Sequence, residues 1–185
     1  GLIGLGAIGR ATARKLHALG VKRLIGWNRT LRPQVANTAL NAHVELVDLQ
    51  KVVRESDIVV VAIALTPETR NLLNEKMLAQ MKNGAYLINI SRGAVVDEDA
   101  LADKVAEGKI AGVALDVFSL EPPAGDPFPK AFMQKLISSA KSGSNVILSP
   151  HNAFRTKNSE EKISLRVAEN IVKVINGNTE GVEII

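Results

Sequence analysis

The stretch from Gly1 to Arg10 constrains this chain more than any other, because it places three glycines between a strand pattern and a helix pattern. Gly4, Gly6 and Gly9 have the spacing G-x-G-x-x-G. In this context the first glycine permits a tight turn, the second lets the backbone approach a pyrophosphate, and the third lets the helix pack closely on the strand. The amides that open the helix would then face the phosphates. We therefore expect a dinucleotide site here, the alternative being a glycine-rich turn without a ligand.

Strand and helix patterns alternate along the whole chain, which is typical of an open parallel sheet with helices on both faces. The continuous β-branched run at 58–64 suits a strand that is buried on both faces. Further strands are expected at 1–5, 21–27, 44–47, 85–90, 110–117 and 146–148. Helices are expected at 7–19, 49–55, 75–82, 98–107, 131–141 and 159–176, with a short helix or turn at 33–41. The sequence thus predicts an α/β fold, a doubly wound parallel sheet of the Rossmann type, with residues 1–185 as one dinucleotide-binding domain.

Polar residues suited to capping precede several of the expected helices. The candidate N-caps are Asp48, Asn74, Asp97 and Asn158. Asn158 is followed three residues later by Glu161, as in a capping box. Apolar residues recur at helical spacing in the last helix, and we expect them to pack inward: Ile163, Val167, Ile171 and Val174.

Composition excludes several classes of function. The chain has 185 residues with 46% hydrophobic content, which suits a domain with a proper core. It has no cysteine, and no His, Asp and Glu cluster has metal-ligand spacing, so we expect neither disulfides nor a metal site. Aromatic content is only 3% and the basic residues are scattered at a net charge of +4, which argues against nucleic acid.

The sequence also suggests where the protein works. No apolar run reaches the ~18 residues of a membrane span, and no basic-then-apolar leader is visible. With the absence of cysteine, this favours the cytoplasm. The first residue is not Met, so we expect the chain to be a piece of a longer protein.

Asn28, Arg29 and Thr30 follow the second expected strand. NAD-binding domains of this kind place an acidic residue there, which accepts hydrogen bonds from the adenosine ribose. A carboxylate would repel a 2′-phosphate, whereas Arg29 could pair with one. We therefore favour NADP(H), with NAD(H) possible and Arg32 as a second candidate for the phosphate. The alternative is that Arg29 is only a solvated turn residue.

Four segments in this order resemble the D-isomer-specific 2-hydroxyacid dehydrogenases: 4–9, 89–97 (NISRGAVVD), 114–122 (ALDVFSLEP) and 149–151 (SPH). The segments 21–29 and 62–68 are most similar to the glyoxylate/hydroxypyruvate reductases, which use NADPH. The segment 151–156 is more similar to the D-lactate-type members, so the subfamily stays open.

The resemblance implies a catalytic set of Arg92, Glu121 and His151. Arg92 would bind the substrate carboxylate and stabilise charge on the carbonyl oxygen. His151 would donate a proton, and Glu121 would orient the imidazole and raise its pKa. Asp116 matches the residue that contacts the nicotinamide carboxamide. The alternatives are a helix-cap salt bridge for Arg92, an exposed turn acid for Glu121 and a structural role for His151.

The glycine motif and the resemblance together give one expected cofactor-binding set. Its members are Gly4, Gly6, Ala7, Ile8, Gly9, Asn28, Arg29, Thr30, Leu65, Thr66, Ile90, Ser91, Arg92, Asp116, His151 and Ala153. The resemblance implies hydride transfer between NAD(P)H and a small 2-keto acid, such as glyoxylate or hydroxypyruvate, in a homodimer. It also implies a separate substrate domain, which we expect to be absent from this chain. The alternatives are a phosphoglycerate or D-lactate dehydrogenase, or a dinucleotide-sensing co-regulator similar to the transcriptional corepressors among the family's relatives.

Overall fold

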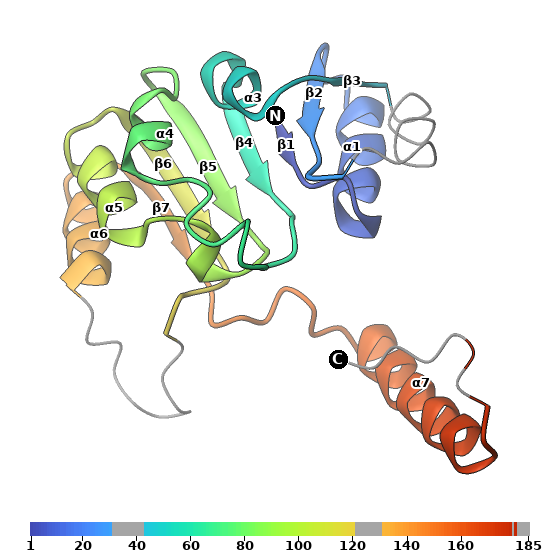
Figure 1. The fold of residues 1–185 in the computed structure, drawn as a ribbon. Coiled ribbons are helices and arrows are strands. Elements are labelled where there is room, and N and C mark those ends of the chain that lie inside the picture. The colour runs from blue at the N-terminus through green and yellow to red at the C-terminus, as the bar shows by residue number, and fades with distance from the viewer. Residues whose placement is uncertain (31–42, 121–130, 179, 181–185) are drawn as a thin grey trace. The chain divides into compact units, whose positions relative to one another are not determined.

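The computed structural model describes residues 1–30, 43–120, 131–178 and 180 (Figure 1). The chain divides into two compact units, Gly1–Pro150 and His151–Ile185. The expectation of a short helix or turn at 33–41 lies outside the described residues.

The described part of the first unit contains a parallel sheet of seven strands, in the order β3-β2-β1-β4-β5-β6-β7. The strands are β1 (Leu2–Ile3), β2 (Leu24–Trp27), β3 (Val44–Leu46), β4 (Ile58–Val61), β5 (Ala85–Asn89), β6 (Ile110–Leu115) and β7 (Asn145–Leu148). The order reverses direction between β1 and β4, so the chain leaves these two strands toward opposite edges of the sheet. Ligands bind at such a switch point in open α/β sheets. The predicted doubly wound fold is confirmed.

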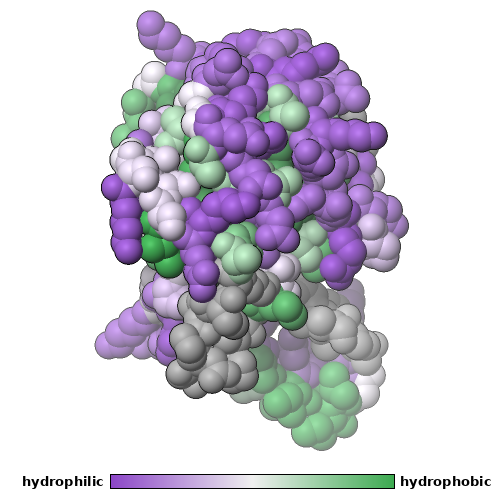
Figure 2. Space-filling model, turned by 90° about the vertical axis from the view of Figure 1, so that its left-hand side faces the viewer, coloured by the Kyte–Doolittle hydropathy of each residue, from purple (hydrophilic) through white to green (hydrophobic). Residues whose placement is uncertain are grey.

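Helices connect these strands on both faces of the sheet. Those among the described residues are α1 (Ala7–Ala18), α3 (Leu49–Glu55), α4 (Glu75–Ala79), α5 (Glu98–Ala106) and α6 (Ala131–Lys141), with a 3-10 turn η1 (Gly93–Val95). Right-handed crossovers place α1 on one face and the other four on the opposite face. Figure 1 shows α4, α5 and α6 along one side of β5, β6 and β7, and Figure 2 shows that their outer surface is mostly hydrophilic.

Each face of the sheet carries its own apolar cluster. The larger cluster packs α3 to α6 on the sheet and includes Val59 and Val61 of β4. The smaller one lies under α1 and includes Ala13 and Val60. Successive residues of β4 therefore point to opposite clusters, which is the burial on both faces that its β-branched run predicts.

Capping residues and glycine turns account for several of the element boundaries. Asp48, Asn74 and Asp97 are N-caps as predicted, because their side chains accept hydrogen bonds from the amides of Lys51, Met77 and Ala100. β1 ends earlier than expected, because Gly4 turns the chain with a φ of +97°. β2 to β6 are also shorter than their expected ranges, by one to three residues, whereas β7 begins one residue earlier than expected, at Asn145.

The described part of the second unit contains one long helix, α7 (Lys157–Ile175). The predicted N-cap at Asn158 is wrong. Thr156 caps the helix instead, because its hydroxyl accepts from the amide of Ser159 at 3.1 Å while the Ser159 hydroxyl accepts from the amide of Thr156 at 3.0 Å. The four apolar residues expected to pack inward are 51–54% exposed: Ile163, Val167, Ile171 and Val174. That expectation is also wrong, since the described part of this unit offers the helix no second layer to pack on.

Candidate functional site

The three glycines of the motif differ in what surrounds them. A Cβ on Gly4 would lie 2.6 Å from the carbonyl oxygen of Ala62, and one on Gly9 would lie 2.0 Å from that of Gly4. A Cβ on Gly6 would meet no atom within 4 Å. The protein's own packing therefore requires glycine at two positions, whereas at Gly6 the backbone borders open space. A ligand that comes close to the backbone fits this space.

The start of α1 adds positive potential next to Gly6. Gly6 is the N-cap residue and its position carries no side-chain cap, and the first turn has no acidic residue. The amides of Ala7, Ile8 and Gly9 belong to the first turn and have no intrahelical acceptor. These amides and the helix dipole suit an anionic group such as a pyrophosphate. The residues present therefore fit a dinucleotide.

Two hollows meet at the carboxyl ends of β1 and β4. We call the one of about 320 Å³ the arginine-29 hollow; it is lined by Gly4, Gly6, Asn28, Arg29, Thr30 and residues 62–64. We call the one of about 360 Å³ the arginine-92 hollow; it is lined by Ile8, Leu65, Ile90, Ser91, Arg92 and the same residues 62–64. The shared wall makes them neighbours along one edge of the sheet. Most of the predicted cofactor residues of the first unit line one hollow or the other.

In the arginine-29 hollow, Asn28 ties two chain segments together. Its Oδ1 accepts from the amide of Leu5 at 2.9 Å, and its Nδ2 donates to the carbonyl oxygen of Thr30 at 2.8 Å. Both ends of the amide are thus engaged with the backbone. Asn28 therefore holds the glycine turn against the exit of β2.

Arg29 reaches across to the segment that follows β4. Its Nη1 donates to the hydroxyl of Thr66 at 2.8 Å and to a carboxylate oxygen of Glu68 at 3.1 Å. The Thr66 hydroxyl most strongly, then the amide of Glu68 and Arg29, lowers the pKa of the Glu68 carboxyl from its ordinary value. Glu68 was not assigned from the sequence, because nothing local links positions 29 and 68.

In the arginine-92 hollow, a buried amide holds the turn that carries Arg92. The Oδ1 of Asn89 accepts from the amide of Ser91 at 3.0 Å and from its hydroxyl at 2.8 Å, and its Nδ2 donates to the carbonyl oxygen of Arg92 at 3.1 Å. Arg92 itself is exposed, and its Nη1 donates to the carbonyl oxygen of Ser91 at 2.7 Å. Asn89 was missed as a positioning residue, although a polar side chain at the end of an apolar strand was an available signal.

The same turn packs against the segment that follows β6. A Cβ on Gly93 would lie 2.1 Å from backbone atoms of Phe118 and Ser119. Asp116 is 6% exposed, donates its amide to the carbonyl oxygen of Asn89 at 3.1 Å and accepts from the Ser149 hydroxyl at 2.7 Å. The predicted Asp116 therefore lies at the same edge of the sheet as the turn of Arg92.

The other expected site residues are not brought together by the described structure. Glu121 and Arg32 lie outside the described residues. His151 and Ala153 begin the second unit. There His151 has a left-handed φ of 51°, and its ring meets that of Phe154 edge-on, with centroids 5.7 Å apart. The convergence of Arg92, Glu121 and His151 stays a prediction.

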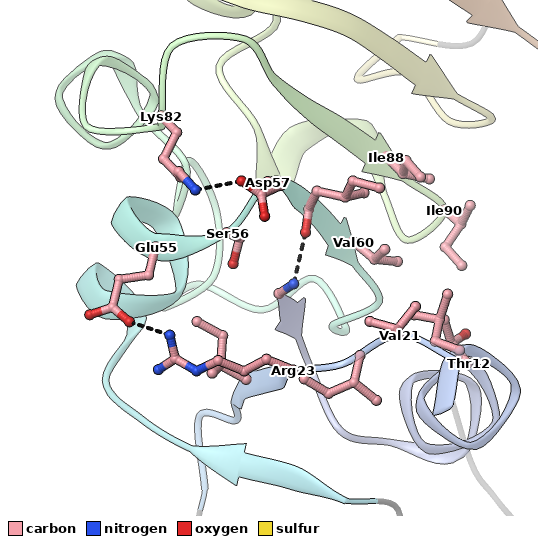
Figure 3. A pocket seen from close by; sticks show the side chains of 15 residues that line it. Thr12, Val21, Arg23, Glu55, Ser56, Asp57, Val60, Lys82, Ile88 and Ile90 are labelled. Atoms are coloured by element: carbon pink, nitrogen blue, oxygen red, sulfur yellow. Dashed lines mark hydrogen bonds and ion pairs between the residues drawn. The ribbon is translucent and has the colours of Figure 1, made fainter. Parts of the chain in front are cut away.

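A larger hollow of about 590 Å³ lies elsewhere in the first unit (Figure 3). Its lining is mostly apolar, and Figure 3 shows Lys82 paired with Asp57 at its rim. Among the residues that line it, Ile90 is the only predicted site residue, and no glycine of the motif takes part. Size alone therefore does not select the functional site.

The described residues form neither a metal site nor a membrane-spanning helix. No group of three or more His, Asp or Glu side chains is placed there to hold a metal ion. None of the described helices combines the length and the apolarity that crossing a membrane requires.

A family model and the similar curated proteins point to the same family. A family model described as "D-isomer specific 2-hydroxyacid dehydrogenase, NAD binding domain" matches residues 1–153. The glyoxylate reductase of Thermofilum pendens is 40% identical over 178 residues, which are 96% of this chain and 48% of that protein. The hydroxypyruvate reductase of Thermotoga maritima is 35% identical over 173 residues, which are 94% of this chain and 51% of that protein.

Solved structures agree with these sequence relatives. The D-lactate dehydrogenase of Aquifex aeolicus, complexed with NAD and lactic acid, aligns with a TM-score of 0.82 and 30% identity, over 98% of this chain and 54% of that chain. The chain thus spans about half the length of the curated relatives it matches.

Proposed function

Because this chain belongs to the D-isomer specific 2-hydroxyacid dehydrogenase family and matches its NAD binding domain, we propose that it binds the nicotinamide dinucleotide of an oxidoreductase that acts on small 2-keto and 2-hydroxy acids. The observation that carries this proposal is the open space beside Gly6, at the uncapped start of α1. No atom of the chain itself requires a glycine at position 6. A ligand that approaches the backbone there would explain why this residue has no side chain.

The residues at the arginine-92 hollow suit the chemistry of a keto acid. The bound nicotinamide would supply the hydride. The guanidinium of Arg92 would bind the substrate carboxylate as a fork and stabilise negative charge on the carbonyl oxygen. His151 would donate the proton to that oxygen, and Glu121 would orient its imidazole. Asp116 would contact the carboxamide of the nicotinamide.

We propose glyoxylate or hydroxypyruvate as the keto acid, since relatives with these names are 35–40% identical to the chain. A D-lactate dehydrogenase activity is the second candidate, favoured by the structural similarity to the enzyme that holds lactic acid. Steady-state rates of the whole protein on glyoxylate, hydroxypyruvate, pyruvate and phosphohydroxypyruvate separate these candidates. Turnover of none of the four would contradict the proposed substrate class.

Binding of the dinucleotide is tested on the 185-residue chain. Trp27 is the one tryptophan in the sequence and directly precedes Asn28 at the end of β2. A reduced dinucleotide bound beside it should quench its emission. We expect saturable quenching by NADPH and by NADH, and we expect NADPH to bind more tightly. If calorimetry detects neither dinucleotide, the proposed function is wrong.

The preference for NADP(H) is proposed from the charge of Arg29, which lines the arginine-29 hollow. Arg29→Ala should weaken NADPH binding by about 10- to 100-fold, because a charge-assisted hydrogen bond to the 2′-phosphate is lost. NADH binding should change far less. Equal losses for both dinucleotides would mean that Arg29 does not read the 2′-position.

A homodimer and a cytoplasmic location belong to the same proposal. The dimer rests on the family resemblance alone, and light scattering on the whole protein tests it. The cytoplasm is favoured by the absence of cysteine from the 185 residues.

A further inference from the structure

We propose that Glu68 is a specificity-determining residue for the dinucleotide, because its carboxylate competes with a 2′-phosphate for Arg29. The inference rests on the proposed function, since it concerns the same dinucleotide site. It goes further by naming an internal competitor that limits how strongly the arginine can favour NADP(H) over NAD(H).

The competition follows from where the two side chains come from. Arg29 follows β2 and Glu68 lies in the turn that follows β4, so the ion pair joins strands on opposite sides of β1. Nη1 of Arg29 is 3.1 Å from the Glu68 carboxylate and 2.8 Å from the Thr66 hydroxyl. Within the described part of the chain, Nε and Nη2 of Arg29 make no hydrogen bond. Arg29 is therefore held in place by Thr66 and Glu68, and two nitrogens of its guanidinium are available to an incoming anion.

The turn that holds Glu68 is fixed by its own hydrogen bonds. Thr69 is 1% exposed; its Oγ1 accepts from the amide of Thr66 at 2.7 Å and donates to the carbonyl oxygen of Ala64 at 2.7 Å. The amide of Arg70 donates to the carbonyl oxygen of Thr66 at 2.9 Å. Pro67 further limits the backbone. Glu68 can therefore leave Arg29 by rotating its side chain, whereas moving the turn would break several bonds.

Charge gives the direction of the effect. A 2′-phosphate that binds Arg29 must displace the carboxylate or share the guanidinium with a like charge nearby. The 2′-hydroxyl of NAD(H) carries no charge and meets no such repulsion. The side chains of Arg29 and Glu68 are 46% and 67% exposed, so water screens the pair and its effect is modest. Removing the Glu68 charge should raise the ratio of NADPH to NADH affinity by about two- to fivefold.

The experiment is a double-mutant cycle on the 185-residue chain. Dissociation constants for NADPH and NADH are measured for the parent, Glu68→Gln, Arg29→Ala and the double variant, at low and at high salt. Glu107→Gln is the matched control, because the Glu107 side chain is 56% exposed and pairs with Lys104 at 2.8 Å, and its loss changes the net charge equally. We expect Glu68→Gln to raise the NADPH preference, to do so less at high salt, and to do nothing when Arg29 is absent. Glu107→Gln should leave the preference unchanged.

The outcomes separate this inference from the proposed function. If Glu68→Gln leaves the preference unchanged while Arg29→Ala still weakens NADPH selectively, Glu68 is not a competitor and the NADP(H) proposal stands. If Glu68→Gln and Glu107→Gln raise the preference equally, only net charge acts and the inference fails. If the parent chain binds neither dinucleotide, the proposed function itself is wrong. Thermal melting of each variant checks that the exposed substitutions leave the fold intact.

Discussion

The two neighbouring hollows at the carboxyl edge of the sheet are built by different kinds of contact. The arginine-29 hollow depends on exposed side chains, since Arg29 and Glu68 are 46% and 67% exposed. The arginine-92 hollow depends on buried ones, since Asn89 and Asp116 are 1% and 6% exposed. The comparison indicates that the first hollow can change its charge without cost to the fold, whereas the second shares its hydrogen bonds with the core.

The difference follows from the elements that carry each hollow. β5 lies between β4 and β6, so the polar residue at its end is enclosed on both sides. The exit of β2 and the turn after β4 meet at the surface, where water competes for every charge. We therefore expect substitutions at the arginine-29 hollow to change the cofactor preference, and substitutions of the buried residues at the arginine-92 hollow to destabilise the fold.

The largest effect is expected from Arg92→Gln in the whole protein. Loss of a fixed charge from a developing oxyanion should lower kcat by about 10²- to 10³-fold, while dinucleotide affinity falls much less. Steady-state kinetics with glyoxylate or hydroxypyruvate checks this. Arg70→Gln is the control, because Arg70 is exposed and lines neither hollow. Unchanged kcat for Arg92→Gln would favour the structural alternative for this arginine.

Asn89→Ala and Glu68→Gln compare the contributions of the two hollows to stability. Asn89→Ala leaves the amide and hydroxyl of Ser91 and the carbonyl of Arg92 without their buried partner. Unfolding free energy should fall by about 2–3 kcal/mol, measured by denaturant titration. Glu68→Gln should change it by less than about 1 kcal/mol. Equal losses for the two variants would remove the distinction between the hollows.

The sequence predicted those parts of the molecule that depend on neighbours in the chain. Glycine spacing, β-branched runs and capping residues are local, and they predicted the parallel sheet and three N-caps, whereas the strand order and its switch point came only from the structure. The site was predicted only in part, because its contacts join distant segments. Glu68 acts through Arg29, which is 39 positions away, and no local pattern carries such a pairing. The N-cap of α7 was missed because Thr156 and Ser159 form a reciprocal pair that Asn158 and Glu161 imitate in spacing alone.

Gly6 lines the arginine-29 hollow at the start of α1, and its substitution separates binding from folding. Gly6→Ala should weaken both dinucleotides by about tenfold, because the added methyl group occupies the space beside the backbone. Its melting temperature should stay near that of the parent. Gly9→Ala is the contrast, since its Cβ would meet the carbonyl oxygen of Gly4 and overpacking should cost about 1–3 kcal/mol. If Gly6→Ala binds both dinucleotides as tightly as the parent, the dinucleotide does not approach the backbone of the glycine motif.

The smallest effect is expected at Thr66, which gives the arginine-29 hollow an internal test. Thr66→Val removes a hydroxyl that accepts from exposed Arg29, so unfolding free energy should fall by only about 0.5–1 kcal/mol. Thr69→Val removes the hydroxyl that bridges the Thr66 amide and the Ala64 carbonyl from a side chain that is 1% exposed. That loss leaves buried backbone groups unpaired and should cost about 1–3 kcal/mol. Denaturant titration of the two variants compares hydroxyls three residues apart in one turn. A larger loss of unfolding free energy for Thr66→Val than for Thr69→Val would mean that the Arg29 contact supports the fold. Charged side chains at the arginine-29 hollow could then not be substituted without loss of stability.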